Sequence, residues 1–138
     1  MNLKSISYKK FIPGILWFIL VLILICLPKH EIPEIEPMWW FSIIAPDKIV
    51  HAGMFGMLNY LFIIPIFKSE MVGKTKINYF IWISILASVW GLSTEFIQLL
   101  VPGRSFDLLD WLADSIGVLM ALIYIYWKFY QNRKNQHP

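Results

Sequence analysis

Charged residues are scarce in this chain. Asp, Glu, Lys and Arg make up 15% of its 138 residues, whereas they make up about a quarter of an average soluble domain. Hydrophobic residues make up 58% and are grouped into long blocks. This combination excludes an ordinary water-soluble domain and indicates that the chain is dissolved in a lipid bilayer. The net charge of +3 is small, and we expect no nucleic-acid partner.

The chain contains a single cysteine, Cys26. A disulfide within the chain is therefore excluded, and we interpret Cys26 as a lipid-facing or packing residue. Internal repeats are also lacking, and the length accommodates one domain, 1–138. No signal-peptide cleavage site follows the first apolar run, 11–27, which continues with Pro28 and Lys29. We therefore expect this run to be a retained helix.

Four apolar segments are long enough for transmembrane helices, which need roughly 17–25 apolar residues. They comprise residues 11–27, 49–67, 77–100 and 108–127. Pro13 falls in the opening turn of the first segment, where proline is tolerated. The predicted fold class is an all-α integral membrane four-helix bundle.

Basic residues are divided unevenly between the two sides of this bundle. Only Lys29, Lys48 and Arg104 lie on one side, and the other nine accompany the two termini and the second connection. The positive-inside rule therefore predicts that both termini are cytoplasmic. In the first extracytoplasmic connection, 28–46, residues 38–41 favour a short interfacial helix. Trp39 and Trp40 in this stretch are candidates for lining an entrance from the outer leaflet.

Ionisable residues gather near the extracytoplasmic ends of three predicted helices. They are His51 on the second, Glu95 on the third, and Asp110 and Asp114 on the fourth. The rise of a helix places these residues in one layer on the order of 10 Å deep. Asp110 and Asp114 are four residues apart and share a helix face. Ionisable groups inside a span are costly and are therefore functional candidates.

These residue types favour acid–base chemistry. His51 would act as general acid or base because its unperturbed pKa is near neutrality, and Glu95 or Asp114 would orient it or act as the second acid–base group. The predicted catalytic residues are His51, Glu95, Asp110 and Asp114. The predicted substrate-binding residues are Asp47, Lys48, Gln98, Arg104 and Ser105.

Arg104 and Lys48 would hold a phosphate or carboxylate, arginine with two parallel hydrogen bonds. Ser105 is the only hydroxyl nucleophile near the cluster, and a helix-capping role is favoured for it. Asp47 and Asp107 are likewise candidates for helix N-caps. The chain therefore offers no convincing nucleophile for covalent catalysis.

Other structural roles compete with the functional ones. Asp110 suits the first turn of a helix, where the dipole favours a carboxylate. Asn59 and Gln98 are expected to form hydrogen bonds between helices. An ion pair of Glu95 or Asp114 with Arg104 or with a histidine also stays open.

No cofactor and no metal are predicted. The weaker alternative is a divalent cation, for which the cluster offers mixed nitrogen and oxygen ligands. Those ligands would be His51, Glu95, Asp110 and Asp114. A single histidine without a fixed local spacing gives this alternative little support.

Three motifs in order carry a family resemblance. They are D-K-x-x-H at residues 47–51, E-x-x-Q followed by P-G-R at 95–98 and 102–104, and D-x-x-A-[N/D]-x-x-G at 110–117. Together they resemble the VanZ-like family over roughly residues 28–121. The resemblance implies a small membrane protein of the bacterial inner membrane, in a family with links to resistance to the glycopeptide teicoplanin. Asp114 stands where Asn is common, and its extra negative charge argues against a simple anion site.

Three functions are compatible with these features. The first is an enzyme that acts on a lipid-linked cell-envelope substrate in the outer leaflet. The second is a non-catalytic protein that binds such a precursor, another phospholipid or a similar amphiphile. The third is a proton or ion transporter, which is disfavoured because the cytoplasmic half of the predicted bundle is apolar. The sequence does not separate enzyme from binding protein, and it leaves the oligomeric state open.

Overall fold

The computed structural model describes residues 6–28, 46–71 and 73–136. They form a short 3-10 helix η2 (Tyr8–Phe11) and the helices α1 (Ile12–Ile25), α2 (Pro46–Phe67), α3 (Gly73–Gln98) and α4 (Leu108–Gln136). Four helical segments are long and apolar enough to cross a membrane, the first of them being η2 and α1 together. No strand occurs in these described ranges. The all-α, four-span prediction is confirmed.

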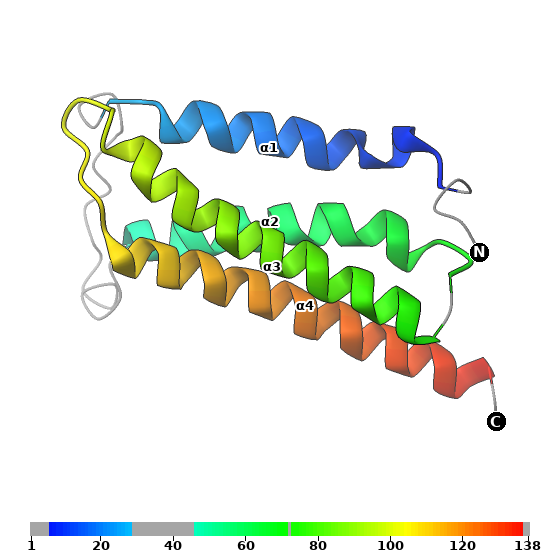
Figure 1. Cartoon of the computed structure of the whole chain (residues 1–138). Helices are drawn as coiled ribbons and strands as arrows, with labels where there is room; N and C mark the ends of the chain where they lie inside the picture. The colour runs from blue at the N-terminus through cyan, green and yellow to red at the C-terminus, as the bar shows by residue number, and fades with distance from the viewer. Residues whose placement is uncertain (1–5, 29–45, 72, 137–138) are drawn as a thin grey trace.

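The four long helices run alongside one another (Figure 1). One end of the bundle, here called the terminal end, contains the start of η2, the end of α4 and the connection between α2 and α3. The opposite end contains the connection 99–107 and the first turns of α2 and α4, and is called the polar end. The sequence predicts that the terminal end faces the cytoplasm.

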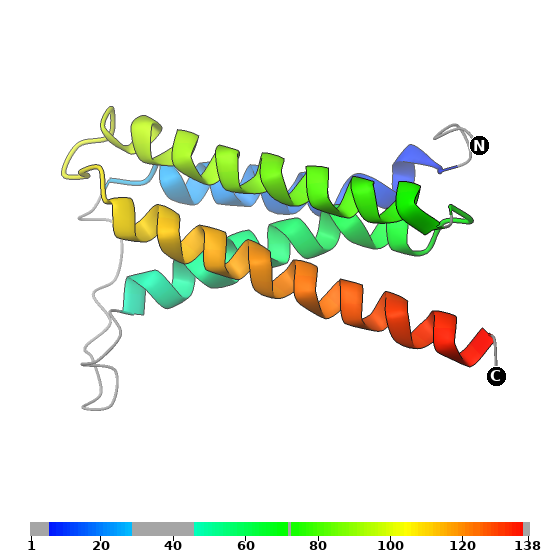
Figure 2. The same ribbon diagram turned by 60° about the horizontal axis from the view of Figure 1, so that its bottom comes forward.

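Helices α2 and α4 make the closest contact in the bundle and cross each other (Figure 2). A Cβ atom built on Gly117 would lie 2.0 Å from the backbone oxygen of Ala52, and one on Gly56 would lie 3.0 Å from the backbone oxygen of Gly117. Small residues permit such close approach of membrane helices. Glycine at position 117 is therefore required for the contact that brings the polar groups of α2 and α4 together.

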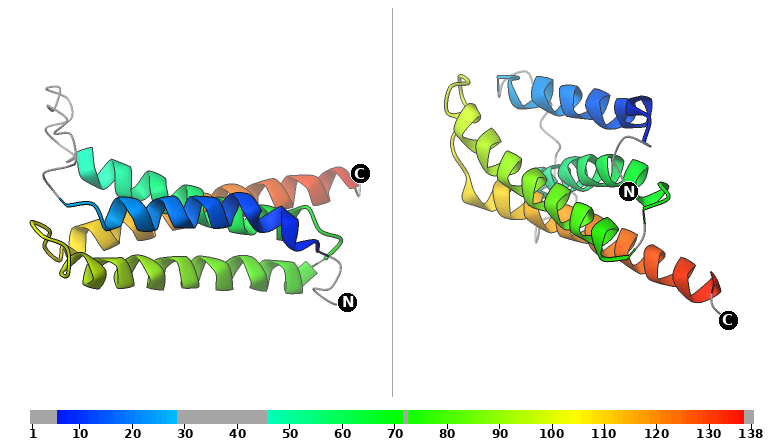
Figure 3. Two further views of the ribbon diagram at one scale, coloured as in Figure 1. Left: turned by 90° about the horizontal axis from the view of Figure 1, so that it is seen from above. Right: turned by 45° about the vertical axis from the view of Figure 1, so that its right-hand side comes forward.

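Helix α1 lies at the periphery, on the side of α2 and α3 that faces away from α4 (Figure 3). Val21 and Ile25 of α1 pack into an apolar core with Phe55 of α2. Trp17 fastens α1 further, since its Nε1 donates a hydrogen bond of 2.9 Å to the backbone oxygen of Met54. The helices that position the polar end are therefore α2, α3 and α4.

Several helix ends differ from the sequence-based boundaries. Helix α2 starts at residue 46 instead of 49, α3 spans 73–98 instead of 77–100, and α4 continues to 136 instead of 127. Hydropathy marks the part of a helix that lies in hydrocarbon, whereas polar residues continue the helix into water. The stretch expected to form an interfacial helix, with Trp39 and Trp40, lies outside the described residues.

Candidate functional site

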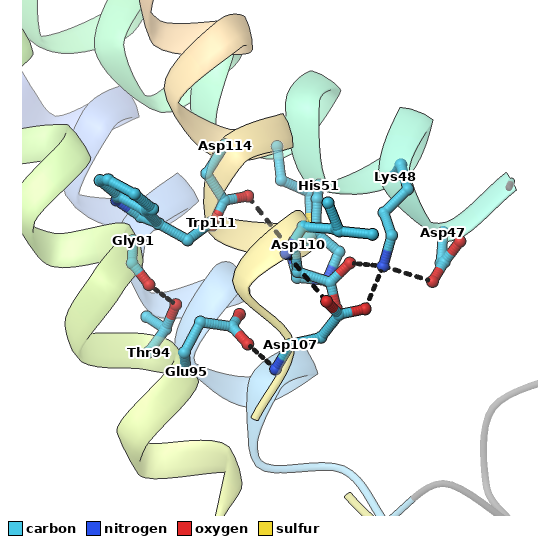
Figure 4. A network of polar contacts seen from close by, with 12 residues as sticks. Asp47, Lys48, His51, Gly91, Thr94, Glu95, Asp107, Asp110, Trp111 and Asp114 are labelled. Carbon is cyan, nitrogen blue, oxygen red and sulfur yellow. Dashed lines mark hydrogen bonds and ion pairs between the residues drawn. The ribbon is translucent and has the colours of Figure 1, made fainter. Parts of the chain in front are cut away.

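Three helices bring ionisable side chains together at the polar end (Figure 4). The first turns of α2 supply Lys48 and His51, the last turn of α3 supplies Glu95, and the start of α4 supplies Asp110 and Asp114, with Asp107 just before it. These six residues are here called the polar cluster. The sequence predicted that ionisable residues of three helices lie in one layer near one end of the bundle, and the structure places them there.

Lys48 links the rim of the polar cluster. Its ammonium group lies 2.5 Å from Asp107 Oδ2 and 3.3 Å from Asp47 Oδ2, and it also forms an ion pair with Asp110. The three carboxylates surround the only ammonium among the cluster residues. Lys48, expected to hold an anionic substrate, is therefore already engaged by carboxylates of the chain itself.

His51 lies between two carboxylates and is almost fully buried. Its Nδ1 is 3.0 Å from Asp114 Oδ1, and its Nε2 is 3.8 Å from Asp110 Oδ2. A carboxylate beside one ring nitrogen fixes the orientation of the ring and favours one tautomer. The arrangement suits a histidine that moves a proton or ligates a metal.

Glu95 and Asp114 are fully buried, each with 0% of its surface exposed. Glu95 Oε2 accepts a hydrogen bond of 3.1 Å from the backbone N–H of Asp107. Glu95 Oε1 and Asp114 Oδ2 have no hydrogen-bond partner in the described part of the chain. A buried polar atom without a partner costs about 1–3 kcal/mol, so these two oxygens lower the stability of the folded protein.

Asp107 combines two roles at the start of α4. Its Oδ1 accepts a hydrogen bond of 2.8 Å from the backbone N–H of Leu109, which confirms the expected capping role. The Lys48 ammonium, followed by this hydrogen bond, holds the pKa of the Asp107 carboxyl below its usual value. Sequence reasoning missed its place in the cluster because the contact with Lys48 joins residues 59 positions apart.

Other predicted site residues lie outside the centre of the cluster. Arg104 Nε donates to the backbone oxygen of Leu27 at 3.4 Å. Ser105 is exposed and forms no hydrogen bond with another described residue. Gln98 is buried one turn beyond Glu95, and Asp47 is exposed at the rim. Glu95 thus has no ion pair with Arg104, and the Thr94 hydroxyl beside it donates to the backbone oxygen of Gly91 at 2.6 Å.

An apolar groove between α2 and α4 begins beside the polar cluster. It has a volume of about 720 Å³ and is lined only by residues of these two helices. Lys48 lies at one end of the lining, and Tyr60 and Ala121 each lie more than three helical turns into their helices. Gly53, which has no side chain, and the small Ala113 leave room between the two helices. The groove connects the membrane-spanning surface with the cluster.

Three residues of the cluster have donor atoms close enough to share a metal ion. One donor atom each from His51, Glu95 and Asp114 lies within 4.8 Å of the other two. Asp110, the fourth ligand of the weaker sequence-based alternative, instead accepts from Lys48. The structure therefore groups three of the four candidate ligands, His51, Glu95 and Asp114.

Comparison with known proteins supports the motif-based interpretation. No curated protein and no solved structure matches the chain significantly. A family model described as VanZ/LLP1 matches residues 15–129, which include α2, α3 and the first three quarters of α4. Because the match covers most of the chain and all residues of the polar cluster, the protein belongs to the VanZ/LLP1 family.

Proposed function

We propose that the protein binds a lipid-linked precursor of the bacterial cell envelope, with the lipid tail in the groove between α2 and α4 and the head group at the polar cluster. The observation that carries the proposal is the continuity of the groove with Lys48, which belongs to both. In the predicted topology, this places the head group at the outer face of the cytoplasmic membrane.

The groove suits a hydrocarbon chain. Its lining is apolar apart from Lys48 and Tyr60 at its two ends, and includes Ile49, Met57 and Met120, which are partly exposed on the membrane-facing surface. Its volume of about 720 Å³ falls in the range of roughly 300–1,000 Å³ typical of ligand sites. A flexible tail fills such a groove without leaving the bilayer, so binding requires only partial extraction of the lipid.

The cluster suits a polar head group with both phosphate and hydroxyl or amine groups. Carboxylates accept hydrogen bonds from hydroxyls and amines, and Asp107 is the partly exposed carboxylate beside Lys48, with the buried Asp110 behind it. Lys48 would donate to a phosphate oxygen in place of one of the three carboxylates that it contacts in the structure. Sugar-linked and peptide-linked lipid precursors carry such mixed head groups, whereas simple hydrocarbons do not.

Catalysis on the same lipid is the second candidate, and the His51–Asp114 contact of 3.0 Å favours it. A histidine oriented by a carboxylate can activate water as a general base. No described hydroxyl side chain offers a covalent route, so a hydrolysis of the head-group linkage by water is the chemistry that fits. Release of product from a polyprenyl-phosphate-linked sugar, followed by mass spectrometry, separates this candidate from binding alone.

A photoreactive polyprenyl phosphate with a diazirine in its tail tests the binding proposal. With purified protein in nanodiscs, we expect labelling of groove residues of α2 and α4, and competition by unlabelled polyprenyl phosphate but not by the polyprenyl alcohol. Gly53→Phe should reduce labelling strongly, because a Cβ at Gly53 meets no atom within 4 Å and the larger side chain enters the groove. Leu86→Phe on the exposed face of α3 is the matched control.

Two outcomes would contradict the proposal. Labelling confined to α3 would show that the groove does not hold the tail. Efficient disulfide cross-linking of two copies through Ile116→Cys in a Cys26→Ser background would show that a second copy covers the groove instead. Either result excludes the lipid as the resident ligand of this surface.

Protection against teicoplanin is the expected consequence in cells, because a protein that holds an envelope precursor alters what the antibiotic meets at the surface. Expression of the protein should raise the inhibitory concentration of teicoplanin, and Glu95→Gln and Asp114→Asn should abolish that rise at equal expression. Glu70→Gln, which changes an exposed carboxylate at the terminal end, is the control. Full protection by both cluster variants would rule out a role for the cluster.

A further inference from the structure

We propose that His51, Glu95 and Asp114 bind a divalent transition-metal ion, Mn²⁺ or Zn²⁺. Their side chains come from α2, α3 and α4 respectively (Figure 4), and one donor atom of each lies within 4.8 Å of the others. Ligand atoms bound at about 2.1 Å lie roughly 3–4 Å apart around such an ion. Because the donor atoms lie within 4.8 Å of one another, side-chain movements that shorten these separations by about 1 Å would bring the three groups onto a metal.

Unpaired oxygen atoms are the first independent sign of a ligand. Glu95 Oε1 and Asp114 Oδ2 are buried and have no hydrogen-bond partner in the described residues. Both carboxyl groups are completely buried, so bulk water does not satisfy these atoms. A bound cation would supply the missing partner to both groups at once.

The charge of the cluster is the second sign. Five carboxylates surround Lys48 and His51, namely those of Asp47, Glu95, Asp107, Asp110 and Asp114. Lys48 contacts the three at the rim and does not reach the two at the centre. Even a protonated His51 leaves negative charge in excess, and buried charge is costly unless it is paired. A divalent ion at the centre balances the charge there.

The donor set indicates which ion is preferred. One imidazole nitrogen with two carboxylates is intermediate between the all-oxygen sites of Ca²⁺ or Mg²⁺ and the sulfur-rich sites of softer metals. Three protein ligands also leave coordination positions open, as in metal sites that bind water or substrate. Mn²⁺ and Zn²⁺ match both properties.

Neighbouring groups hold two of the ligands in place. His51 Nε2 faces Asp110 Oδ2 at 3.8 Å while Nδ1 faces Asp114, and Lys48 fixes Asp110 from the other side. The backbone N–H of Asp107 holds Glu95 Oε2. A carboxylate behind a ligating histidine is the usual arrangement around protein-bound metals.

Binding of Mn²⁺ alone to the purified protein is the primary test. The protein, stripped with chelator and carrying a tag without histidine, should remove free Mn²⁺ from solution with one ion per chain, as followed by electron paramagnetic resonance. In a His30→Gln, His137→Gln background, His51 is the only histidine, so pulsed spectra of bound Mn²⁺ should show coupling to an imidazole nitrogen. Zn²⁺ should compete with Mn²⁺ for the site.

Ligand variants locate the ion. Glu95→Gln and Asp114→Asn should each weaken Mn²⁺ binding by at least about 10-fold, and Asp110→Asn by roughly 10-fold through the orientation of His51. Glu70→Gln removes an exposed carboxylate at the terminal end, outside the cluster, and should leave the affinity unchanged. Absence of Mn²⁺ and Zn²⁺ binding to the wild-type protein, or bound Mn²⁺ without imidazole coupling, overturns the proposal even where a variant fails to fold.

A bound divalent ion would also convert an acidic site into one that accepts a phosphate oxygen, a consequence that rests on the proposed lipid function. Labelling by the polyprenyl phosphate probe should then fall in chelator and return with Mn²⁺. Labelling that is independent of Mn²⁺ would remove this bridging role. Because Mn²⁺ binding is measured without lipid, failure of the metal site and failure of lipid binding are distinguishable.

Discussion

Buried polar groups in the middle of this bundle behave differently from those at its polar end. In the middle, Asn59 Nδ2 donates to Ser84 Oγ and to the backbone oxygen of Val118, both at 2.9 Å, and Ser84 Oγ donates to the backbone oxygen of Phe80. At the polar end, Glu95 and Asp114 each keep one oxygen without a partner among the described residues. The first group holds helices together, whereas the second keeps hydrogen-bonding capacity that the described residues do not fill.

The terminal end repeats the behaviour of the middle. Lys76 is buried there, but its ammonium donates to the backbone oxygens of Phe67 and Ser69 at 2.7 and 2.9 Å and lies over the ring of Phe129. Charge alone therefore does not mark a functional residue in this protein. The polar end is set apart by buried carboxylate oxygens without a partner among the described residues, whereas the unpartnered Trp90 Nε1 belongs to a neutral indole packed against the apolar core.

Substitution of Gly117 by alanine should have the largest effect, because it disrupts the contact between α2 and α4 on which both the middle and the polar end of the bundle depend. The added Cβ would meet the backbone of Ala52, and the two helices would have to separate. We expect a loss of about 3 kcal/mol in the free energy of unfolding, together with loss of Mn²⁺ binding. Thermal unfolding in detergent measures it. Gly53→Ala, which meets open space, is the control and should stabilise α2 slightly.

Asn59→Leu should damage the middle of the bundle alone. It removes the hydrogen bonds to Ser84 and to Val118, and such bonds between membrane helices contribute about 1–2 kcal/mol at most. The unfolding temperature should fall while Mn²⁺ affinity stays that of the wild type. A variant with normal stability but weakened Mn²⁺ binding would show that the middle and the polar end are not separate in function.

Glu95→Gln should have the opposite sign. Glutamine keeps an oxygen for the N–H of Asp107 and removes an incompletely paired buried carboxylate. Without added divalent ions, we expect stability equal to the wild type or higher, by an amount on the order of 1 kcal/mol. Loss of stability comparable to that of Asn59→Leu in the same assay would mean that Glu95 serves the fold rather than a ligand.

Much of the fold was accessible from sequence because lipid demands continuous apolar helices. The hydrophobic runs predicted four spans and placed His51, Glu95 and Asp114 at one end of three of them. The helix ends were less accessible, because residues 128–136 of α4 are mostly polar although they are helical.

The internal pairing of the site was out of reach from sequence. Rotation of each helix decides which carboxylate meets Lys48, and the spacing within one helix says nothing about its partner's rotation. The groove between α2 and α4 also depends on how closely the backbones approach at Gly117. Arg104 illustrates the same limit, since its contact with the backbone of Leu27 joins two connections that no motif relates.

The rim of the cluster should show the smallest effect, and this effect should disappear at low pH. Lys48 and the capping hydrogen bond hold the pKa of Asp107 below its usual value, so the ionised form is favoured in the folded state. This contribution to stability is complete above the ordinary pKa of the carboxyl, near 3.8, and is lost as the pH falls through the lower folded value.

Asp107→Asn isolates this contribution, because asparagine also caps a helix but has no charge for Lys48. At neutral pH, without divalent ions, the variant should be less stable than the wild type by less than about 1 kcal/mol, as expected for a partly exposed ion pair. The difference should shrink as the pH falls below 4. A difference that stays constant down to that range would mean that the cap geometry, and not the charge of Asp107, stabilises the start of α4. The rim would then resemble the structural contacts at the middle of the bundle, and the distinctive electrostatics would be confined to His51, Glu95 and Asp114.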